Sequence, residues 1–258
     1  MLHQGKIYFA SDLHLGTPDA ASSMLREKLF VSWLDEIKTD AQEIFIVGDV
    51  FDFWHEYGTV VPKGFVRLLG KLAELCDAGI PVHIFTGNHD LWMFGYLETE
   101  IGVTIHRAPV EREFYGKKFL IGHGDGLGPG DHGYKFIKKI FSNSVCQFFF
   151  KWLHPDIGVG LANYLSLKSR YGVAGEKKEL ETFKGEEKEW LIVYAKRMLQ
   201  HQHYHYFIFG HRHLPLDIKL NENSRYLNTG DWIDYNSYAV FDANQMQLKY
   251  YKPTTVVI

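Results

Sequence analysis

Carboxylate, amide and imidazole side chains gather at five places along the chain, each directly after a short apolar run. The five sequences are Asp12-Leu13-His14, Gly48-Asp49, Gly87-Asn88-His89-Asp90, Gly122-His123-Gly124-Asp125 and Gly210-His211-Arg212-His213. They offer oxygen and nitrogen ligands without thiolate, a set that suits Mn, Fe or Zn rather than a structural zinc finger. A single such histidine is more often structural, and only the recurrence of the pattern favours a metal site. The set has more ligands than one ion needs, which favours two ions that share a carboxylate. Asp49, central in the order of the motifs, is the expected shared ligand. Pairs of ions held in this way catalyse phosphoryl displacement.

The elements that must position these residues can be read from the same stretches. Near-continuous runs of β-branched and aromatic residues predict strands buried on both faces, at 6–10, 43–47, 82–86, 118–121 and 206–209. Apolar residues at helical spacing predict helices within 25–37 and 65–75, with Gly79 as the end of the second. Alternation of strand and helix predicts an α/β architecture with at least partly parallel pairing, and such sheets bind ligands at the carboxyl ends of their strands.

Two later regions follow other patterns. Residues 225–251 hold short strand-like pieces broken by turns, which predicts antiparallel strands that close a second sheet. Residues 127–204 contain no convincing strand and are predicted to form helices and loops inserted between two strands. We therefore expect a single domain over residues 1–258, with 127–204 as an inserted helical cap.

Composition narrows the class of protein. The chain has 258 residues, 46% of them hydrophobic, and a formal net charge of -3, which supports a globular core and argues against bulk nucleic-acid binding. Cys76 and Cys146 lie far apart, as reduced thiols of a cytoplasmic protein would. The sequence shows no leader pattern and no uncharged run of membrane-spanning length.

As an ordered set, the five sequences resemble the motifs of the calcineurin-like metallophosphoesterases, over residues 11–213. The resemblance implies a β-sandwich of two mixed sheets flanked by helices. It implies two divalent metal ions, with Mn²⁺ favoured over Fe, Zn or Mg. The first ion would be held by Asp12, His14, Asp49 and His213, and the second by Asp49, Asn88, His123 and His211. His89 would then be a catalytic acid or electrostatic donor, oriented by Asp90.

A narrower resemblance concerns the substrate. The motif of Ser/Thr phosphatases, with its arginine, is absent after Asp49, so phosphoprotein is an unlikely substrate. Residues 11–15 and 122–125, followed by a long helical region, resemble the UDP-2,3-diacylglucosamine pyrophosphohydrolases of lipid A biosynthesis, which release UMP and diacylglucosamine 1-phosphate. This resemblance implies a nucleotide-linked glycolipid as partner, contacted by Asp131 and Tyr134. Polar donors for its phosphates and sugar are expected from Ser166, Lys168, Arg170 and Lys177, which could equally form a solvated surface.

The predicted cap is rich in aromatic residues, and three interpretations stay open. An apolar slot for acyl chains could be formed by Phe136, Phe141, Phe148, Phe149, Phe150 and Trp152. With the interleaved lysines, the same face could rest on the inner face of the cytoplasmic membrane. An ordinary helix packed on the core is the third interpretation.

One departure leaves the activity open as well. The best-known lipid A enzymes have arginine where this chain has His89. The chain is thus either a branch that keeps the histidine or a capped phosphodiesterase with another substrate. A third reading, a non-catalytic binding scaffold, is disfavoured because every expected ligand is present.

Overall fold

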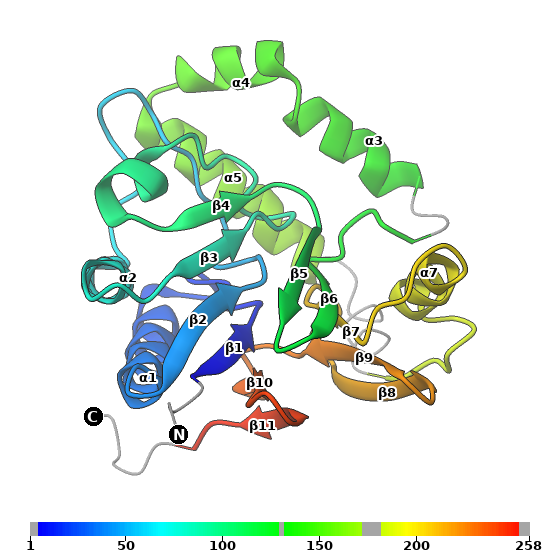
Figure 1. Cartoon of the computed structure of the whole chain (residues 1–258). Coiled ribbons are helices and arrows are strands. Elements are labelled where there is room, and N and C mark those ends of the chain that lie inside the picture. The colour runs from blue at the N-terminus through cyan, green and yellow to red at the C-terminus, as the bar shows by residue number, and fades with distance from the viewer. Residues whose placement is uncertain (1–4, 129–131, 172–181, 253–258) are drawn as a thin grey trace.

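The computed structural model describes residues 5–128, 132–171 and 182–252, and shows two β-sheets packed face to face with helices outside them (Figure 1). The residues between the sheets are almost all aromatic or branched aliphatic. Ile7, Phe9, Phe45 and Val47 from one sheet meet Phe119 and Ile208 from the other, and Phe9 stacks on Phe119 with ring centroids 6.0 Å apart. Burial of these side chains is what holds the two sheets together.

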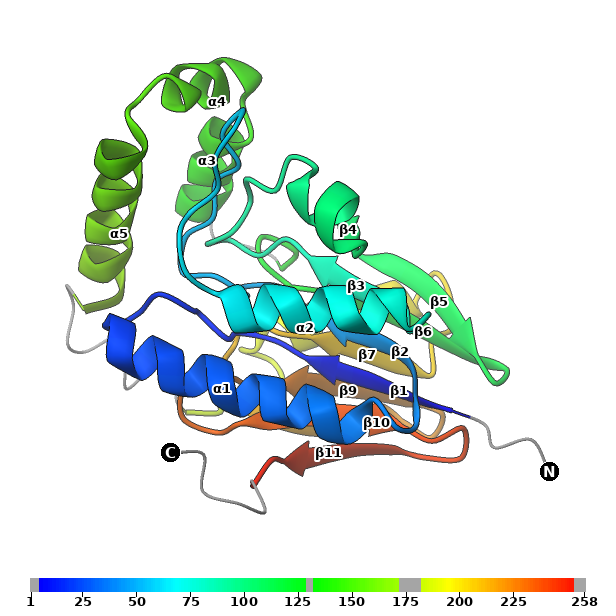
Figure 2. The same cartoon turned by 90° about the vertical axis from the view of Figure 1, so that its left-hand side faces the viewer.

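Six strands form the first sheet. Their order is β11 (Met246–Tyr250), β10 (Ser237–Phe241), β1 (Lys6–Ala10), β2 (Ala41–Ile46), β3 (Val82–Phe85) and β4 (Thr104–His106). Strands β1 to β4 run parallel, whereas β10 is antiparallel to both β1 and β11. Alternate residues such as Tyr8 and Ile46 face outward, where α1 (Ala20–Ile37) and α2 (Val66–Asp77) cover them (Figure 2). A π-helical turn, η1 (Leu97–Ile101), precedes β4.

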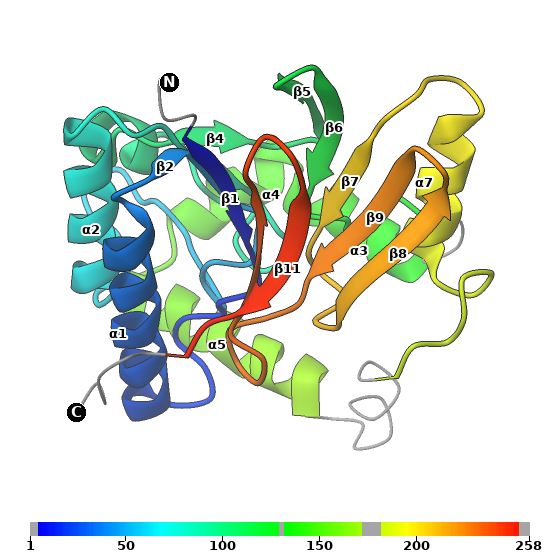
Figure 3. The ribbon, with the colours of Figure 1, turned by 60° about the horizontal axis from the view of Figure 1, so that its bottom comes forward.

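Five strands form the second sheet. Their order is β5 (Val110–Phe114), β6 (Lys117–Gly122), β7 (Tyr206–Phe209), β9 (Ser224–Thr229) and β8 (Pro215–Asn221). Strands β6 and β9 run parallel to β7 between them, whereas the edge strands β5 and β8 are antiparallel to β6 and β9. Helix α7 (Trp190–Leu199) covers the outer face through Leu191 and Ile192, which pack on Phe207 (Figure 3).

Three further helices form an arch that stands apart from the sheets in Figures 1 and 2. They are α3 (His132–Phe141), α4 (Ser144–Lys151) and α5 (Pro155–Tyr171). Among their contacts with the rest of the molecule, Trp92 Nε1 donates a hydrogen bond of 2.8 Å to the Phe141 carbonyl, and Phe150 packs on the Trp92 ring. Within the predicted cap of 127–204, α7 packs on a sheet, and of the helices described there α3 to α5 stand away from the core. None of the described helices combines the length and apolar character needed to cross a bilayer.

The α/β class, the two mixed sheets and the parallel pairing are confirmed, and each of the five predicted strands has a counterpart in β1, β2, β3, β6 or β7. The expectation for residues 225–251 is wrong in part. Strand β9 joins the second sheet but runs parallel to β7, and β10 and β11 extend the first sheet from β1. A strand's burial pattern does not state which sheet it joins, because both sheets bury the same kinds of side chain.

Candidate metal centre

The five motif loops meet at one end of the sandwich, where β1, β2 and β3 of the first sheet and β6 and β7 of the second come to their carboxyl ends. Backbone hydrogen bonds join the loops directly. Asp12 N donates to Gly48 O at 3.0 Å, and Gly210 N donates to His123 O at 3.0 Å. The buried Arg26 of α1 also donates to the carbonyls of Leu13 and His14, at 3.0 and 2.9 Å. The loops are therefore held by the fold itself rather than by their side chains alone.

Several motif residues have a backbone conformation that is rare outside glycine. Nine non-glycine residues of the described part have positive φ, and five of them belong to the predicted ligand set: Asp12, His14, Asp49, His211 and His213, with φ between 45° and 66°. Such conformations cost free energy and cluster at functional sites, where the surrounding structure holds them in place.

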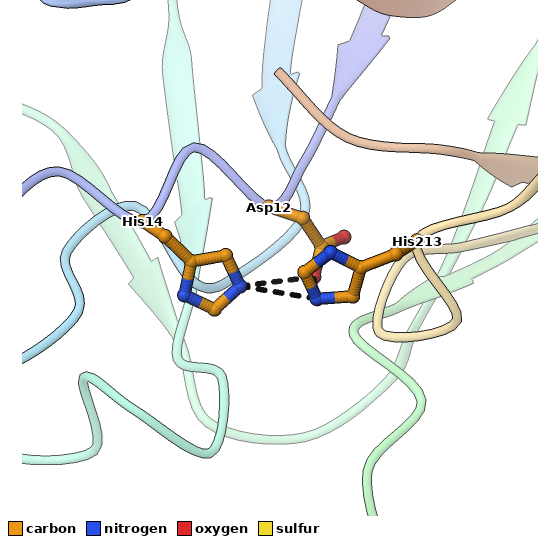
Figure 4. Close-up of side chains that lie close together, drawn as sticks. All are labelled: Asp12, His14 and His213. Atoms are coloured by element: carbon orange, nitrogen blue, oxygen red, sulfur yellow. Dashed lines mark hydrogen bonds and ion pairs between the residues drawn. The ribbon is translucent and has the colours of Figure 1, made fainter. Parts of the chain in front are cut away.

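The first cluster consists of Asp12, His14 and His213 (Figure 4). Their ligand atoms face one another: His14 Nε2 lies 3.1 Å from His213 Nε2, and Asp12 Oδ1 lies 3.4 Å from His213 Nε2 and 3.8 Å from His14 Nε2. The other oxygen of Asp12 accepts hydrogen bonds from His211 N, at 2.9 Å, and from the Ser11 hydroxyl. Asp12 Oδ1 is therefore left as the oxygen that points at the two imidazoles.

The second cluster consists of Asp49, Asn88, His123 and His211. Asn88 Oδ1 lies 2.8 Å from His211 Nδ1 and 3.3 Å from His123 Nε2, and Asp49 Oδ2 lies 3.3 Å from His123 Nε2. The same Asp49 oxygen is 3.5 Å from His14 Nε2 of the first cluster. Asp49 thus lies between the two clusters, in the position expected of a shared ligand.

His89 lies at the edge of the first cluster, where His14, Asp49 and His89 also form a group of converging ligand atoms. Its Nδ1 is 3.1 Å from the carbonyl oxygen of Asp52 and 3.6 Å from the Asp52 carboxylate. The Ser166 hydroxyl, from α5, donates to Asp52 Oδ2 at 2.7 Å and lies 3.3 Å from His89 Nδ1. His89 therefore faces a carboxylate of the core and a hydroxyl of the arch.

The expectation that Asp90 orients His89 does not agree with this geometry. The Asp90 carboxylate accepts hydrogen bonds from the backbone amides of Gly87 and Val50, at 2.7 and 2.8 Å, and from Phe51. It is fully buried, and burial together with the nearby Asp49 raises its pKa to about 7. Asp90 ties the third motif to the second, and the carboxylate beside the His89 ring is Asp52.

The charges in the two clusters are set by burial and by close neighbours. Burial by itself would raise the pKa of Asp12, but His213 and His14 outweigh it and lower that pKa to about 2. Burial likewise opposes ionisation of Asp49, yet His123, His89 and His14 hold its pKa well below the usual range. Burial and the nearby His123 lower the pKa of His211 to about 4. Two carboxylates are therefore ionised and His211 is neutral at neutral pH, as metal binding requires. Burial opposes protonation of His123, but Asp49 outweighs it and raises the pKa of His123 to about 10, so this imidazole has to release a proton when it binds an ion.

The donor set fits metal ions. Within the described part of the chain, the buried Asp12 Oδ1 has no hydrogen-bond partner, although leaving a buried carboxylate oxygen unpaired is costly. Imidazole nitrogens and carboxylate oxygens point into the same small volume in both clusters. Divalent ions coordinated there would satisfy that oxygen and neutralise the two carboxylates.

The predicted substrate-binding residues are only partly described. Of these, Ser166 is the one whose side chain can be placed, and it contacts Asp52 beside His89. Asp131 and Lys177 lie outside the described residues, and Tyr134, Lys168 and Arg170 lie in α3 and α5 with side chains outside the description. Where they would stand relative to a substrate stays a prediction.

The aromatic residues predicted to form an apolar slot do not form one on α4, and the side chain of Phe136 lies outside the described residues. Phe148, Phe149 and Trp152 of α4 are exposed, and Trp152 is 76% accessible, so they do not line an interior slot. A cavity of about 710 Å³ instead lies between α1, residues 53–65 and α5. Its walls are mostly apolar and include Leu15, Phe53, Tyr57, Val61, Phe65 and Val159. One of its wall residues, Leu15, directly follows His14 in the chain, and none of the cluster residues lines it.

Sequence reasoning assigned no role to three residues that contact the clusters. Asp52 lies 3.5 Å from His14 Nδ1, Ser11 bonds Asp12, and Asp231 lies 3.1 Å from His213 Nδ1. The position of Asp52 near the clusters could have been predicted from the sequence, because it stands three residues after Asp49 on the same loop. Asp231 follows β9 in a stretch that looks like an ordinary Asn-Thr-Gly-Asp turn, so only the fold shows where it lies.

Comparison with known proteins agrees with this architecture. The sequence profile of the family described as calcineurin-like phosphoesterase matches residues 5–215. A UDP-2,3-diacylglucosamine hydrolase of Porphyromonas gingivalis is 41% identical, over 95% of this chain and 97% of that protein. One of Pseudomonas fluorescens is 28% identical, over 88% and 87%. Among solved structures, the E. coli phosphoesterase Yfce is 14% identical, with a TM-score of 0.42 over 91% of this chain and 87% of that one. The chain belongs to the calcineurin-like phosphoesterase family.

Proposed function

We propose that the chain is a dimetal hydrolase that cleaves the pyrophosphate bond of UDP-2,3-diacylglucosamine and releases UMP and 2,3-diacylglucosamine 1-phosphate. The observation that carries this proposal is the 41% identity to the P. gingivalis hydrolase of that substrate, which extends over nearly the whole of both chains. A relative that matched the metal motifs alone would support only a phosphoesterase of some kind.

Membership of the family implies divalent metal ions, and the two clusters supply their ligands. In the proposed assignment Asp12, His14 and His213 bind one ion, Asn88, His123 and His211 bind the other, and Asp49 is shared. Mn²⁺ is the favoured ion, because the ligands are oxygen and nitrogen atoms without thiolate. When bound, the ions would supply Lewis-acid charge and lower the pKa of the attacking water.

The remaining tasks fall to side chains of this chain. His89 stands beside the clusters with its side chain 20% exposed, so it can reach a phosphoryl oxygen of the substrate. Its proposed role is to stabilise negative charge that develops on that oxygen. Asp52 faces the same ring and would hold it, and the Ser166 hydroxyl, 3.3 Å from His89 Nδ1, donates a hydrogen bond to the Asp52 carboxylate. A sugar phosphate is a reasonable leaving group, so the proposed role of His89 is to stabilise the phosphoryl oxygen electrostatically more than to donate a proton.

The cavity whose wall includes Leu15, the residue after His14, supports an acylated substrate. Its volume of about 710 Å³ lies in the range of pockets that hold most of a drug-sized ligand. The lining from Phe53, Val61 and Val159 is apolar, which suits hydrocarbon. In the proposed binding mode, the pyrophosphate of the substrate lies at the two clusters and an acyl chain of the substrate enters this cavity.

Product analysis tests the proposal. The manganese-loaded protein is incubated with UDP-2,3-diacylglucosamine in mild detergent and in ¹⁸O-water, and the products are identified by mass spectrometry. The expected products are UMP that carries the label and unlabelled diacylglucosamine 1-phosphate. Label in the sugar phosphate would contradict attack on the uridylyl phosphorus. No turnover, with bis-p-nitrophenyl phosphate still cleaved, would reject the substrate and indicate a phosphodiesterase of other specificity.

We further propose that the arch rests on an anionic membrane surface, on the inner face of the cytoplasmic membrane. Apolar side chains of α4 and the start of α5 are exposed together: Val145, Phe148, Phe149, Trp152 and Ile157 are each more than half accessible. Lys139 and Lys151 lie exposed among them. Exposed aromatic residues with interspersed lysines are typical of surfaces that bind the headgroup region of anionic bilayers. This placement would bring the arch to the source of an acylated substrate.

A further inference from the structure

Asp231 lies in the loop after β9 and is almost fully buried. Its two carboxylate oxygens have separate partners. Oδ1 accepts hydrogen bonds from the backbone amides of Ile233, Asp234 and Tyr235, at 3.1, 2.9 and 3.2 Å. Oδ2 lies 3.1 Å from His213 Nδ1. Because three amides hold Oδ1, the carboxylate cannot turn, and Oδ2 is directed at the imidazole.

We propose that Asp231 is a positioning residue that holds His213 with its Nε2 directed at the first metal site. A neutral imidazole carries one N–H, so a hydrogen bond from Nδ1–H to Asp231 leaves the lone pair on Nε2. That Nε2 is the atom that lies 3.4 Å from Asp12 Oδ1. Carboxylates that bind the outer nitrogen of a metal-binding histidine fix its orientation and increase its basicity.

His213 needs such a tie more than His14 and His123 do. Its side chain is 27% exposed, whereas those of His14 and His123 are 0% and 1% exposed. Packing fixes the two buried rings, and His123 Nδ1 also lies 2.8 Å from the carbonyl oxygen of Val47. A ring at the rim has room to rotate unless a partner holds it.

The loop that carries Asp231 is itself fixed to the first cluster. Trp232 N donates to the Asp12 carbonyl at 3.2 Å. The Ser11 hydroxyl lies 2.6 Å from the Thr229 hydroxyl and donates to Gly230 O at 3.2 Å. The backbone that precedes Asp12 and the backbone that carries Asp231 therefore move together, which sets the position of Asp231 relative to the site.

Metal affinity tests the inference without any substrate. Mn²⁺ binding to the full chain is measured by competition with a fluorescent chelator for the wild type, D231N and D234N. Asparagine at 231 keeps an oxygen for the three amides but loses the charge that faces His213. We expect one of the two ions to bind about 10- to 100-fold more weakly in D231N. The exposed Asp234 on the same turn serves as the matched control, and D234N should bind as the wild type does.

A double-mutant cycle separates positioning from a structural effect on the turn. If Asp231 acts through His213, adding D231N to H213A should cause no further loss of affinity. The inference would be overturned if D231N lowered the affinity equally in the wild type and in H213A, or if D231N bound metal as the wild type does.

Nuclear magnetic resonance gives a second readout. In zinc-loaded protein, the Nδ1–H proton of His213 should appear at low field in the wild type and D234N and move upfield in D231N. The inference rests on the proposed ligand set and not on the proposed substrate; if H213A bound both ions normally, that ligand set would fail and the inference with it.

Discussion

Glycines of the motifs allow the ligand side chains to approach other loops closely. A Cβ atom at Gly87 would overlap the Asp49 carboxylate and would lie 2.6 Å from the Asp49 amide nitrogen. Both contacts are with a buried group whose Oδ1 already accepts a hydrogen bond from His89 N at 3.0 Å. Asp49 is therefore held in place and cannot easily move away from an added Cβ. Glycine is required at position 87 because a larger side chain has no room, and not because the backbone conformation excludes other residues.

We predict that G87A displaces Asp49 and weakens the binding of both metal ions, because that carboxylate lies between the two clusters. Inserting a carbon into a tightly packed region costs about 1–3 kcal/mol. Urea unfolding of metal-free protein and metal analysis of the loaded protein measure the two effects. The matched control is G70A in α2, where a Cβ meets open space and should stabilise the helix by roughly 0.5–1 kcal/mol. Normal metal content in G87A would show that Asp49 can shift without loss.

His89 is predicted to serve the reaction without holding metal. H89A should lower kcat by about 10²-fold, the lower end of the range for losing one group that stabilises negative charge developing on an oxygen. Its metal content, measured by inductively coupled plasma mass spectrometry, should equal that of the wild type. H203A provides the control, because His203 is exposed and precedes β7, whereas the motif residues follow the other end of that strand. Loss of metal in H89A would instead make His89 a ligand, as its position near His14 and Asp49 also allows.

At the scale of elements, the sequence predicts those parts of the structure that depend on local pattern. The strands that carry the motifs and the two helices α1 and α2 follow from apolar spacing, and Gly79 ends α2 with φ of 79° as its position suggests. The edge strands β4, β5 and β8 are not predicted from the sequence. They are partly exposed, so polar residues interrupt the apolar runs by which a strand is recognised. Contacts between distant segments, such as those of Asp52 with Ser166 and of Asp231 with His213, depend on how the elements pack and have no local signal.

Helix α4 gives a prediction at the same scale. Replacing Phe149 and Trp152 by serine should weaken binding to phosphatidylglycerol vesicles by at least about tenfold, because burying one such side chain contributes roughly 1.5–3 kcal/mol. Cosedimentation with sucrose-loaded vesicles measures this. Y250S is the matched control, since Tyr250 is also an exposed aromatic residue but lies on β11, at the other end of the molecule in Figure 2. Equal binding by the wild type and the double variant would remove the case for membrane contact, while turnover of a soluble diester should be unchanged throughout.

At the scale of the whole molecule, the candidate ligands come from both sheets. Asp12, His14, Asp49 and Asn88 follow strands of the first sheet, whereas His123, His211 and His213 follow strands of the second. Bound ions would therefore connect the sheets at the end where the loops meet, in addition to the apolar contacts between them. Metal binding is thus expected to stabilise the entire fold rather than one loop.

Removal of metal should consequently lower the melting temperature. An ion present at 100 times its Kd stabilises the folded state by about 2.7 kcal/mol, which for a chain of this size corresponds to roughly 5–10 °C per ion. Differential scanning calorimetry before and after treatment with a chelator measures the change, and adding Mn²⁺ back should restore the melting temperature. D49A, which lacks the shared carboxylate, should show little response to Mn²⁺, whereas G70A should respond as the wild type does. If the melting temperature of the wild type did not change with Mn²⁺, the assignment of the metal ligands would be contradicted. The ligand residues come together only in the folded state, so an ion that binds them must stabilise that state.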